Sequence, residues 1–153
     1  MRELSIDGFN LTIEDVVDTG RNLTNVSLSE EARGWMEGSR SVVEEIIQSD
    51  DVVYGINTGF GALSSVKIDS NDLKILQENL IRSHACGVGE NMEYDHVKMM
   101  MLIRANTLCR GQSGSRPIVV ETLIQMINSG VCPVIPRIGS LGASGDLATL
   151  SHL

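Results

Sequence analysis

The chain has 153 residues, of which 42% are hydrophobic and only 3% aromatic, and its formal net charge is -8. An acidic chain without a basic run is not expected to bind nucleic acid, because that binding depends on clustered lysine and arginine. Without a Cys-x-x-Cys pair, no zinc site is expected. No apolar run approaches about 18 residues, so we expect no membrane span.

The compartment is predicted from the cysteines and the N-terminus. The chain has three widely separated cysteines, Cys86, Cys109 and Cys132, which is an odd number and too few for a disulfide framework. Unpaired thiols are typical of a reducing compartment. The first residues include Glu3 and Asp7 and lack the apolar run of a signal peptide. We therefore expect a cytoplasmic protein.

The N-terminal third predicts a strand followed by two helices. Residues 3–6 alternate weakly between polar and apolar side chains, which indicates a short strand. Thr12 and Asp15 have the spacing of a capping box at a helix start. Ser27 and Glu30 repeat that spacing ahead of a longer helix whose apolar residues recur at helical intervals.

The next segment changes character at residue 52. Val52–Ile56 is predicted to be a short strand because it is rich in β-branched and aromatic residues. Three glycines follow at short intervals, Gly55, Gly59 and Gly61, and they disfavour regular structure. These glycines either permit tight turns or let the backbone approach a bound substrate closely.

Three further helices are predicted between residues 70 and 130. Ser70 can cap the first of them. The second spans about residues 95–110 and is ended by Gly111. Pro117 suits the first turn of the third, which stops at Gly130.

The fold class is therefore predicted to be mainly α, with short strands near the N-terminus. We expect a globular N-terminal domain over residues 1–110 and the beginning of a long-helix domain over residues 111–153. The chain stops inside an apolar helical run that follows Asp146. We interpret it as the N-terminal part of a longer protein.

The tripeptide Ala143-Ser144-Gly145 can generate an electrophile from the backbone itself. Gly145 offers an unhindered nitrogen that can attack the carbonyl of Ala143, and loss of water closes a five-membered ring. Dehydration of Ser144 then leaves a reactive methylidene. Taken alone, the tripeptide is more typical of a helix N-cap, which also favours serine and glycine.

The surrounding sequence changes that interpretation. Three segments, Tyr54–Gly61, Asn79–Gly89 and Gly139–His152, resemble in the right order three motifs of the aromatic amino acid ammonia-lyase family. The resemblance extends over nearly the whole chain from about Glu3. The histidine-using branch of the family is the most similar to it.

The resemblance implies a prosthetic group and a catalytic tyrosine. Ala143, Ser144 and Gly145 would become a methylidene-imidazolone, with Asp146 supporting it and without an external cofactor or metal. Tyr54 would act as the base or as the acid for the departing ammonia. From the residue alone, Tyr54 is more typical of a half-buried tyrosine on a strand.

The substrate is suggested by the pair Ser83-His84, which resembles the histidine-using branch. An imidazole can meet another imidazole through its ring nitrogens, so the resemblance implies L-histidine as substrate and trans-urocanate as product. Gly61 and Leu147 would also contact the substrate. Considered alone, His84 is more typical of a histidine that binds the last carbonyls of a helix.

Two kinds of alternative stay open. Within the family, the chain could belong to a phenylalanine or tyrosine ammonia-lyase, or to an aminomutase. In a different class, it could be an inactive N-terminal fragment or a non-catalytic module that oligomerises. The resemblance implies a homotetramer whose active sites draw residues from several subunits. Thr149, Gln112 and Leu141 depart from the usual family residues Pro, His and Val.

Overall fold

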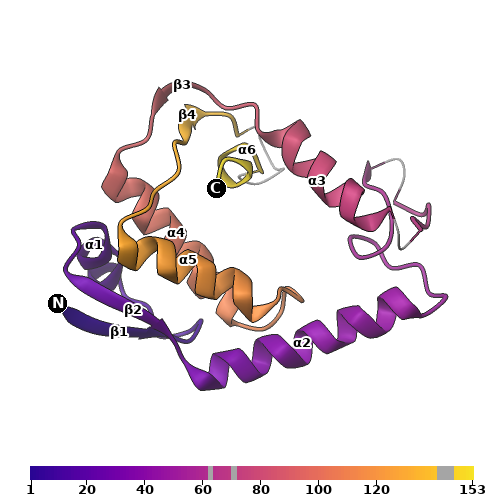
Figure 1. Cartoon of the computed structure of the whole chain (residues 1–153), viewed down its shortest axis with the longest axis horizontal. Coiled ribbons are helices and arrows are strands. Elements are labelled where there is room, and N and C mark those ends of the chain that lie inside the picture. Colours follow the sequence, from indigo (N-terminus) through magenta and orange to yellow (C-terminus); the bar gives the residue numbers. More distant parts are fainter. Residues whose placement is uncertain (62–63, 70–71, 141–146) are drawn as a thin grey trace. The chain divides into compact units, whose positions relative to one another are not determined.

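A computed structural model describes residues 1–61, 64–69, 72–140 and 147–153 (Figure 1). The chain forms two compact units, each built from two separate stretches of sequence. Unit 1 contains Met1–Ser41 and Met92–Val134, and unit 2 contains Val42–Asn91 and Ile135–Leu153. Helices dominate and the strands are short, as predicted. None of the described helices is both long enough and apolar enough to cross a membrane.

Unit 1 begins with two parallel strands joined by a helix. Strand β1 (Arg2–Ile6) pairs with β2 (Thr24–Leu28), and α1 (Ile13–Gly20) connects them. The capping box is present: the Asp15 N–H donates to the Thr12 hydroxyl, and the Asp15 carboxylate accepts from the Thr12 N–H. The predicted strand and the predicted helix start are therefore confirmed.

The core of unit 1 is formed by helices α4 (Tyr94–Cys109) and α5 (Pro117–Ser129), which pack against each other. Helix α1 lies on α4, and β2 lies on α5 (Figure 1). The buried apolar side chains of unit 1 are mostly aliphatic or methionine; they include Ile6, Val26, Met36, Met101, Leu102, Ala105, Val120 and Ile127. Core packing of this kind is the main source of stability in a small domain.

The local signals at both ends of α5 act as predicted. Pro117 occupies the first turn, where its missing N–H is not needed. Gly130 closes the helix in the left-handed conformation with φ 70°. Helix α4 ends at Cys109, and Gly111 follows with φ 65°.

Two local predictions are wrong. Ser27 does not cap α2 (Glu30–Gln48), because β2 keeps pairing with β1 through Leu28 and holds Ser27 in extended backbone. Instead the Ser29 hydroxyl accepts from the Ala32 N–H at 3.1 Å. The strand predicted at Val52–Ile56 is instead a turn, because the Asn57 side chain bonds to the Val53 N–H and the Asp51 carbonyl.

Unit 2 has short elements and a small core. It contains residues 42–48 of α2, helix α3 (Leu73–His84), strand β3 (Val88–Asn91), strand β4 (Pro136–Ile138) and helix α6 (Leu147–Ser151). The two strands are antiparallel, and α6 packs against both α3 and β4. None of the α3 residues is buried. The predicted cap Ser70 lies outside the described residues.

The domain boundary at residue 110 stays a prediction. The two compact units follow a different division, in which each joins a stretch from the first part of the chain to one from the last part. Such interleaving has no signature in composition, because it depends on which distant segments pack together.

Candidate active site

The predicted site residues that the structure describes all belong to unit 2. They are Tyr54, Gly61, Ser83, His84 and Leu147. The tripeptide Ala143-Ser144-Gly145 and Asp146 lie outside the described residues.

Tyr54 lies on a turn and is 62% exposed. Its ring meets the Phe60 ring edge-on, with the centroids 6.1 Å apart. Gly55 and Gly61 adopt φ values of 80° and 58°, which only glycine adopts readily. Among the described residues, no atom beyond the adjacent residues lies within 4 Å of a Cβ built on either glycine, so the positive φ is the feature of the structure that requires glycine at these two positions.

A buried asparagine holds this turn in shape. The Asn57 side chain is almost fully enclosed, with the residue 2% exposed. Its Oδ1 accepts from the Val53 N–H at 2.9 Å, and its Nδ2 donates to the Asp51 carbonyl at 2.8 Å. These backbone groups would pair with another strand in a sheet. Since Asn57 satisfies them, residues 52–56 do not need a strand partner.

Thr58 closes the other side of the same turn. Its hydroxyl accepts from the Gly55 N–H at 3.3 Å and donates to the Gly59 carbonyl at 2.9 Å. Asn57 and Thr58 did not figure in the sequence-based site. An asparagine–threonine pair inside a glycine-rich turn is the signal that could have identified them, because both side chains bond readily to nearby backbone.

His84 occupies the last position of α3 and is half-buried. Its Nδ1 lies 2.8 Å from the Leu80 carbonyl and 3.0 Å from the Ser83 hydroxyl. The Ser83 hydroxyl also lies 2.8 Å from the Leu80 carbonyl. The carbonyl requires a donor, so Nδ1 carries the proton and Nε2 is an acceptor in the neutral ring. The pair thus binds a terminal helix carbonyl, and Nε2 keeps its lone pair for another donor.

The two flanks of the tripeptide segment lie in contact. A Cβ placed on Gly139 would lie 2.7 Å from the Ala148 Cβ and 3.3 Å from the Gly87 Cα. Only glycine allows such a close approach between the end of β4 and the start of α6. The end of β4 and the start of α6, which flank the tripeptide segment in sequence, therefore lie in contact. Leu147, the first residue of α6, is 44% exposed.

A pocket of about 390 Å³ opens beside the Tyr54 turn in unit 2. Three apolar and three polar residues line it: Ile47, Ile68, Leu73, Asn57, Lys67 and Asp69. None of the described site residues contributes to this lining, but Asn57 of the Tyr54 turn does.

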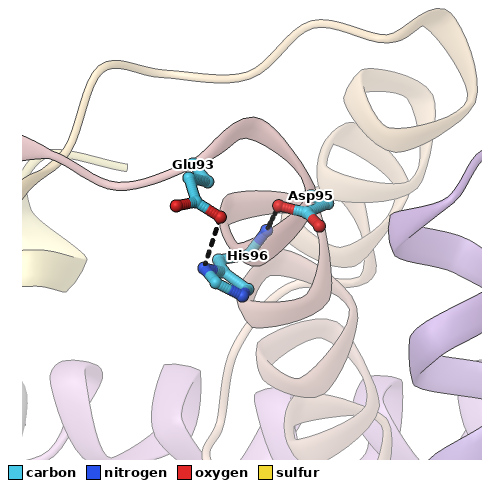
Figure 2. A group of neighbouring side chains, drawn as sticks. All are labelled: Glu93, Asp95 and His96. Carbon is cyan, nitrogen blue, oxygen red and sulfur yellow. Dashed lines mark hydrogen bonds and ion pairs between the residues drawn. The ribbon is translucent and has the colours of Figure 1, made fainter.

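One group in the described part of the chain has the composition of a metal site. Glu93, Asp95 and His96 lie at the beginning of α4 in unit 1, within one turn (Figure 2). The Glu93 carboxylate is 3.6 Å from the His96 Nδ1, and the Asp95 carboxylate accepts from the His96 N–H at 2.8 Å. These contacts are those of an acidic first helical turn. They contribute no residue to the candidate site.

Comparison with known proteins identifies the family. The sequence model described as aromatic amino acid lyase matches residues 11–153. The histidine ammonia-lyase of Alkaliphilus oremlandii is 50% identical over the whole chain, which spans 30% of that protein. Among solved structures, the tyrosine aminomutase of Streptomyces globisporus has a TM-score of 0.89 and 38% identity, covering 98% of this chain and 28% of the other. The histidine ammonia-lyase of Trypanosoma cruzi has a TM-score of 0.88 and 38% identity, covering 99% and 28%. The chain belongs to the aromatic amino acid lyase family.

Proposed function

We propose that the protein to which this chain belongs eliminates ammonia from L-histidine and releases trans-urocanate. The observation that carries the proposal is the 50% identity to a histidine ammonia-lyase along all 153 residues. The pair Ser83-His84 supports the choice of substrate, because His84 presents a ring nitrogen that can accept a hydrogen bond. The chain spans about 30% of the relative's length, so the proposal concerns the complete polypeptide.

The electrophile of the reaction is proposed to be a methylidene-imidazolone made from Ala143, Ser144 and Gly145. The Gly145 nitrogen bonds to the Ala143 carbonyl carbon and one water leaves; a second water leaves from Ser144. The finished group supplies an electron-poor double bond to which the substrate can add. The contact between Gly139 and Ala148 fits this group, because it holds the flanks of the cyclising segment together. Asp146 is proposed to support it.

His84 is proposed to bind the substrate imidazole. Since its Nδ1 is engaged with the Leu80 carbonyl, its Nε2 would accept the N–H of the substrate ring. The Ser83 hydroxyl lies 3.0 Å from the same Nδ1 and 2.8 Å from the same Leu80 carbonyl, so it joins this group of contacts. Gly61 and Leu147 are proposed as further contacts to the substrate.

Tyr54 is proposed to move a proton during the elimination. Its ring rests against Phe60, and its turn is fixed by Asn57, so the phenol occupies a defined position in unit 2. Positioned acid–base groups contribute roughly 10²–10⁴-fold to rate. We expect Tyr54→Phe to lower kcat by an amount in this range while changing KM little.

The test is an assay of the complete polypeptide with L-histidine, following the ultraviolet absorbance of urocanate. His84→Leu should raise KM because it removes the acceptor for the substrate ring. His96→Leu is the matched control, since His96 lies on α4 in unit 1 and pairs only with first-turn carboxylates. A well-folded complete polypeptide that releases no urocanate would overturn the proposal.

A second candidate is a lyase or aminomutase acting on tyrosine or phenylalanine. It is favoured by one observation: the tyrosine aminomutase structure and the histidine ammonia-lyase structure are equally identical to this chain, at 38%. A panel of L-histidine, L-phenylalanine and L-tyrosine separates the candidates. Release of cinnamate-type or β-amino acid products, with L-histidine left unchanged, would favour the second.

The 153-residue chain alone is proposed to be inactive and to associate with itself, as a fragment that lacks the rest of the site. Unit 2 supports this, because its helix α3 has no buried residue. For the complete polypeptide we propose a homotetramer.

A further inference from the structure

A hydrogen bond in unit 2 joins two segments far apart in sequence. The Gly87 N–H donates to the His152 Nε2 at 3.0 Å, across 65 residues of chain. Gly87 lies three residues beyond His84, just after the end of α3. His152 directly follows α6, and its own N–H bonds back to the Ala148 and Thr149 carbonyls.

The surroundings of this bond are tightly packed. A Cβ placed on Gly87 would lie 2.9 Å from the His152 Nε2 and 3.1 Å from the side chain of Pro136. Gly139, at the end of β4, approaches Gly87 and Ala148 just as closely. The end of α3, the end of β4 and α6 therefore meet at one junction, where the His152 Nε2 lies against Gly87.

The imidazole has a specific chemical task at this junction. The Gly87 amide lies beyond the helix, so its N–H needs an acceptor other than the helix carbonyls. A ring nitrogen that accepts must carry a lone pair, which makes His152 neutral with its proton on Nδ1 in this arrangement. An apolar side chain of similar volume could fill the space but could not accept the bond.

We infer that His152 is a positioning residue, one that holds the segment after Gly145 in register with the segment after His84. Gly145 precedes the first residue of α6 by two positions in the sequence, and α6 ends immediately before His152. Through the Gly87 N–H, His152 links the helix that follows the electrophile to the turn that follows the substrate-binding histidine. The inference rests on the proposed function, because it takes those two roles from it.

Loss of the hydrogen bond between Gly87 and His152 is expected to lower kcat. Misplacement of reacting groups by about 1 Å can cost roughly 100-fold in rate. In the complete polypeptide, His152→Leu should lower kcat for L-histidine by at least about tenfold. KM should change less than kcat, because His84 keeps its own bond to the Leu80 carbonyl.

His152→Gln is the variant to compare with His152→Leu. Its amide can present an oxygen near the position of Nε2 and accept from the Gly87 N–H. We expect kcat to return to within about threefold of the wild type. His96→Leu, an exposed histidine of unit 1, is the control and should leave kcat unchanged.

A second approach reaches the same bond without altering the histidine. Gly87 does not adopt a positive φ, so an alanine there is compatible with the backbone. Its methyl group would displace the ring of His152. Gly87→Ala should therefore reproduce the loss of kcat, which tests the inference even if His152→Leu fails to fold.

Hydrogen exchange of the peptide containing Gly87, measured on the same complete polypeptides, reports the bond independently of catalysis. Exchange should accelerate in His152→Leu and return towards the wild-type rate in His152→Gln. The inference is overturned if kcat is unchanged in His152→Leu, if leucine and glutamine reduce it equally, or if the loss follows a lower melting temperature. A wild-type enzyme that makes no urocanate but shows this exchange pattern would instead refute the proposed function.

Discussion

The two units of this chain are stabilised in different ways. Every buried apolar side chain among the described residues belongs to unit 1, except Ile135 and Ala148. The described candidate site residues all belong to unit 2, where buried Asn57 and Thr58 bond to backbone and glycines permit close contacts. Unit 1 therefore contains most of the buried apolar core, while the described candidate site residues of unit 2 lie on turns and short elements. The comparison implies that unit 1 is sensitive to lost volume and unit 2 to lost hydrogen bonds.

The largest expected effect is the loss of stability caused by a cavity in unit 1. Leu102 on α4 is fully buried, so Leu102→Ala should reduce the free energy of unfolding by about 2–5 kcal/mol. Ile75 on α3 is 55% exposed, and Ile75→Ala should cost less than about 1 kcal/mol. Urea unfolding of both variants measures the difference. Equal losses would contradict the assignment of the core to unit 1.

The two units should also differ in how fast their cysteine thiols react. Cys109 is buried in α4, and burial raises the pKa of its thiol to about 12. At pH 8 its thiolate fraction is then on the order of 1 in 10,000. Cys86 lies exposed after α3. Alkylation followed by mass spectrometry should modify Cys86 quickly and Cys109 only upon unfolding; rapid modification of Cys109 in the folded chain would show that unit 1 is open.

The turn that carries Tyr54 should depend on one side chain. Asn57→Ala leaves the Val53 N–H and the Asp51 carbonyl without their partner, at a cost of about 1–3 kcal/mol in local stability. Limited proteolysis should then cut between residues 51 and 61. Asn79→Ala is the control, because Asn79 is exposed on α3 and bonds only to the Arg82 side chain in the contacts described. Unchanged resistance in Asn57→Ala would mean that the turn is held by other contacts.

The smallest expected effect concerns pH and the start of α1. The Thr12 hydroxyl and N–H, followed by Arg2, hold the pKa of Asp15 below its ordinary value of 3.8. Because the folded pKa is depressed, the charged carboxylate stabilises the fold above pH 4 and this contribution disappears as the pH falls through the folded pKa.

Asp15→Asn should therefore lose about 1 kcal/mol at pH 7, the size of a helix-capping interaction, and less at pH 2.5. Glu14→Gln is the matched control, since Glu14 is an exposed neighbour. The melting temperature of both variants at the two pH values provides the measurement. An equal loss at both values in Asp15→Asn would show that the carboxylate charge contributes nothing.

The success of sequence-based prediction follows the range of the interactions. The capping box at Thr12, the first-turn Pro117 and the terminal Gly130 all depend on residues within one helical turn, and each is confirmed. The local spacing predicts a cap at Ser27, because the pairing of Ser27 with Ser5, 22 residues earlier, has no local signal. For the same reason the local sequence does not predict β3 and β4, which are joined by pairs such as Val88 with Ile138.

The residues of the candidate site also differ in whether their role can be inferred from the local sequence. Tyr54, His84 and Ser144 can be proposed as site residues from sequence, because the segments around them resemble motifs of the aromatic amino acid lyase family. Their supporting residues differ in range: Asn57 bonds to backbone groups of its own turn, where the asparagine–threonine pair is a local signal, whereas His152 accepts from the Gly87 N–H across 65 residues. A contact such as that of His152 becomes visible only when the fold brings distant segments together.

The proposed electrophile is tested most directly by the mass of the peptide that contains Ala143, Ser144 and Gly145. The peptide is taken from the complete polypeptide, and the same protein is assayed with L-histidine. If the proposed methylidene-imidazolone forms, wild-type protein that releases urocanate contains a peptide lighter by two water molecules. An inactive Ser144→Ala variant then contains the unmodified peptide. An unmodified wild-type peptide in protein that still releases urocanate would contradict the proposed electrophile.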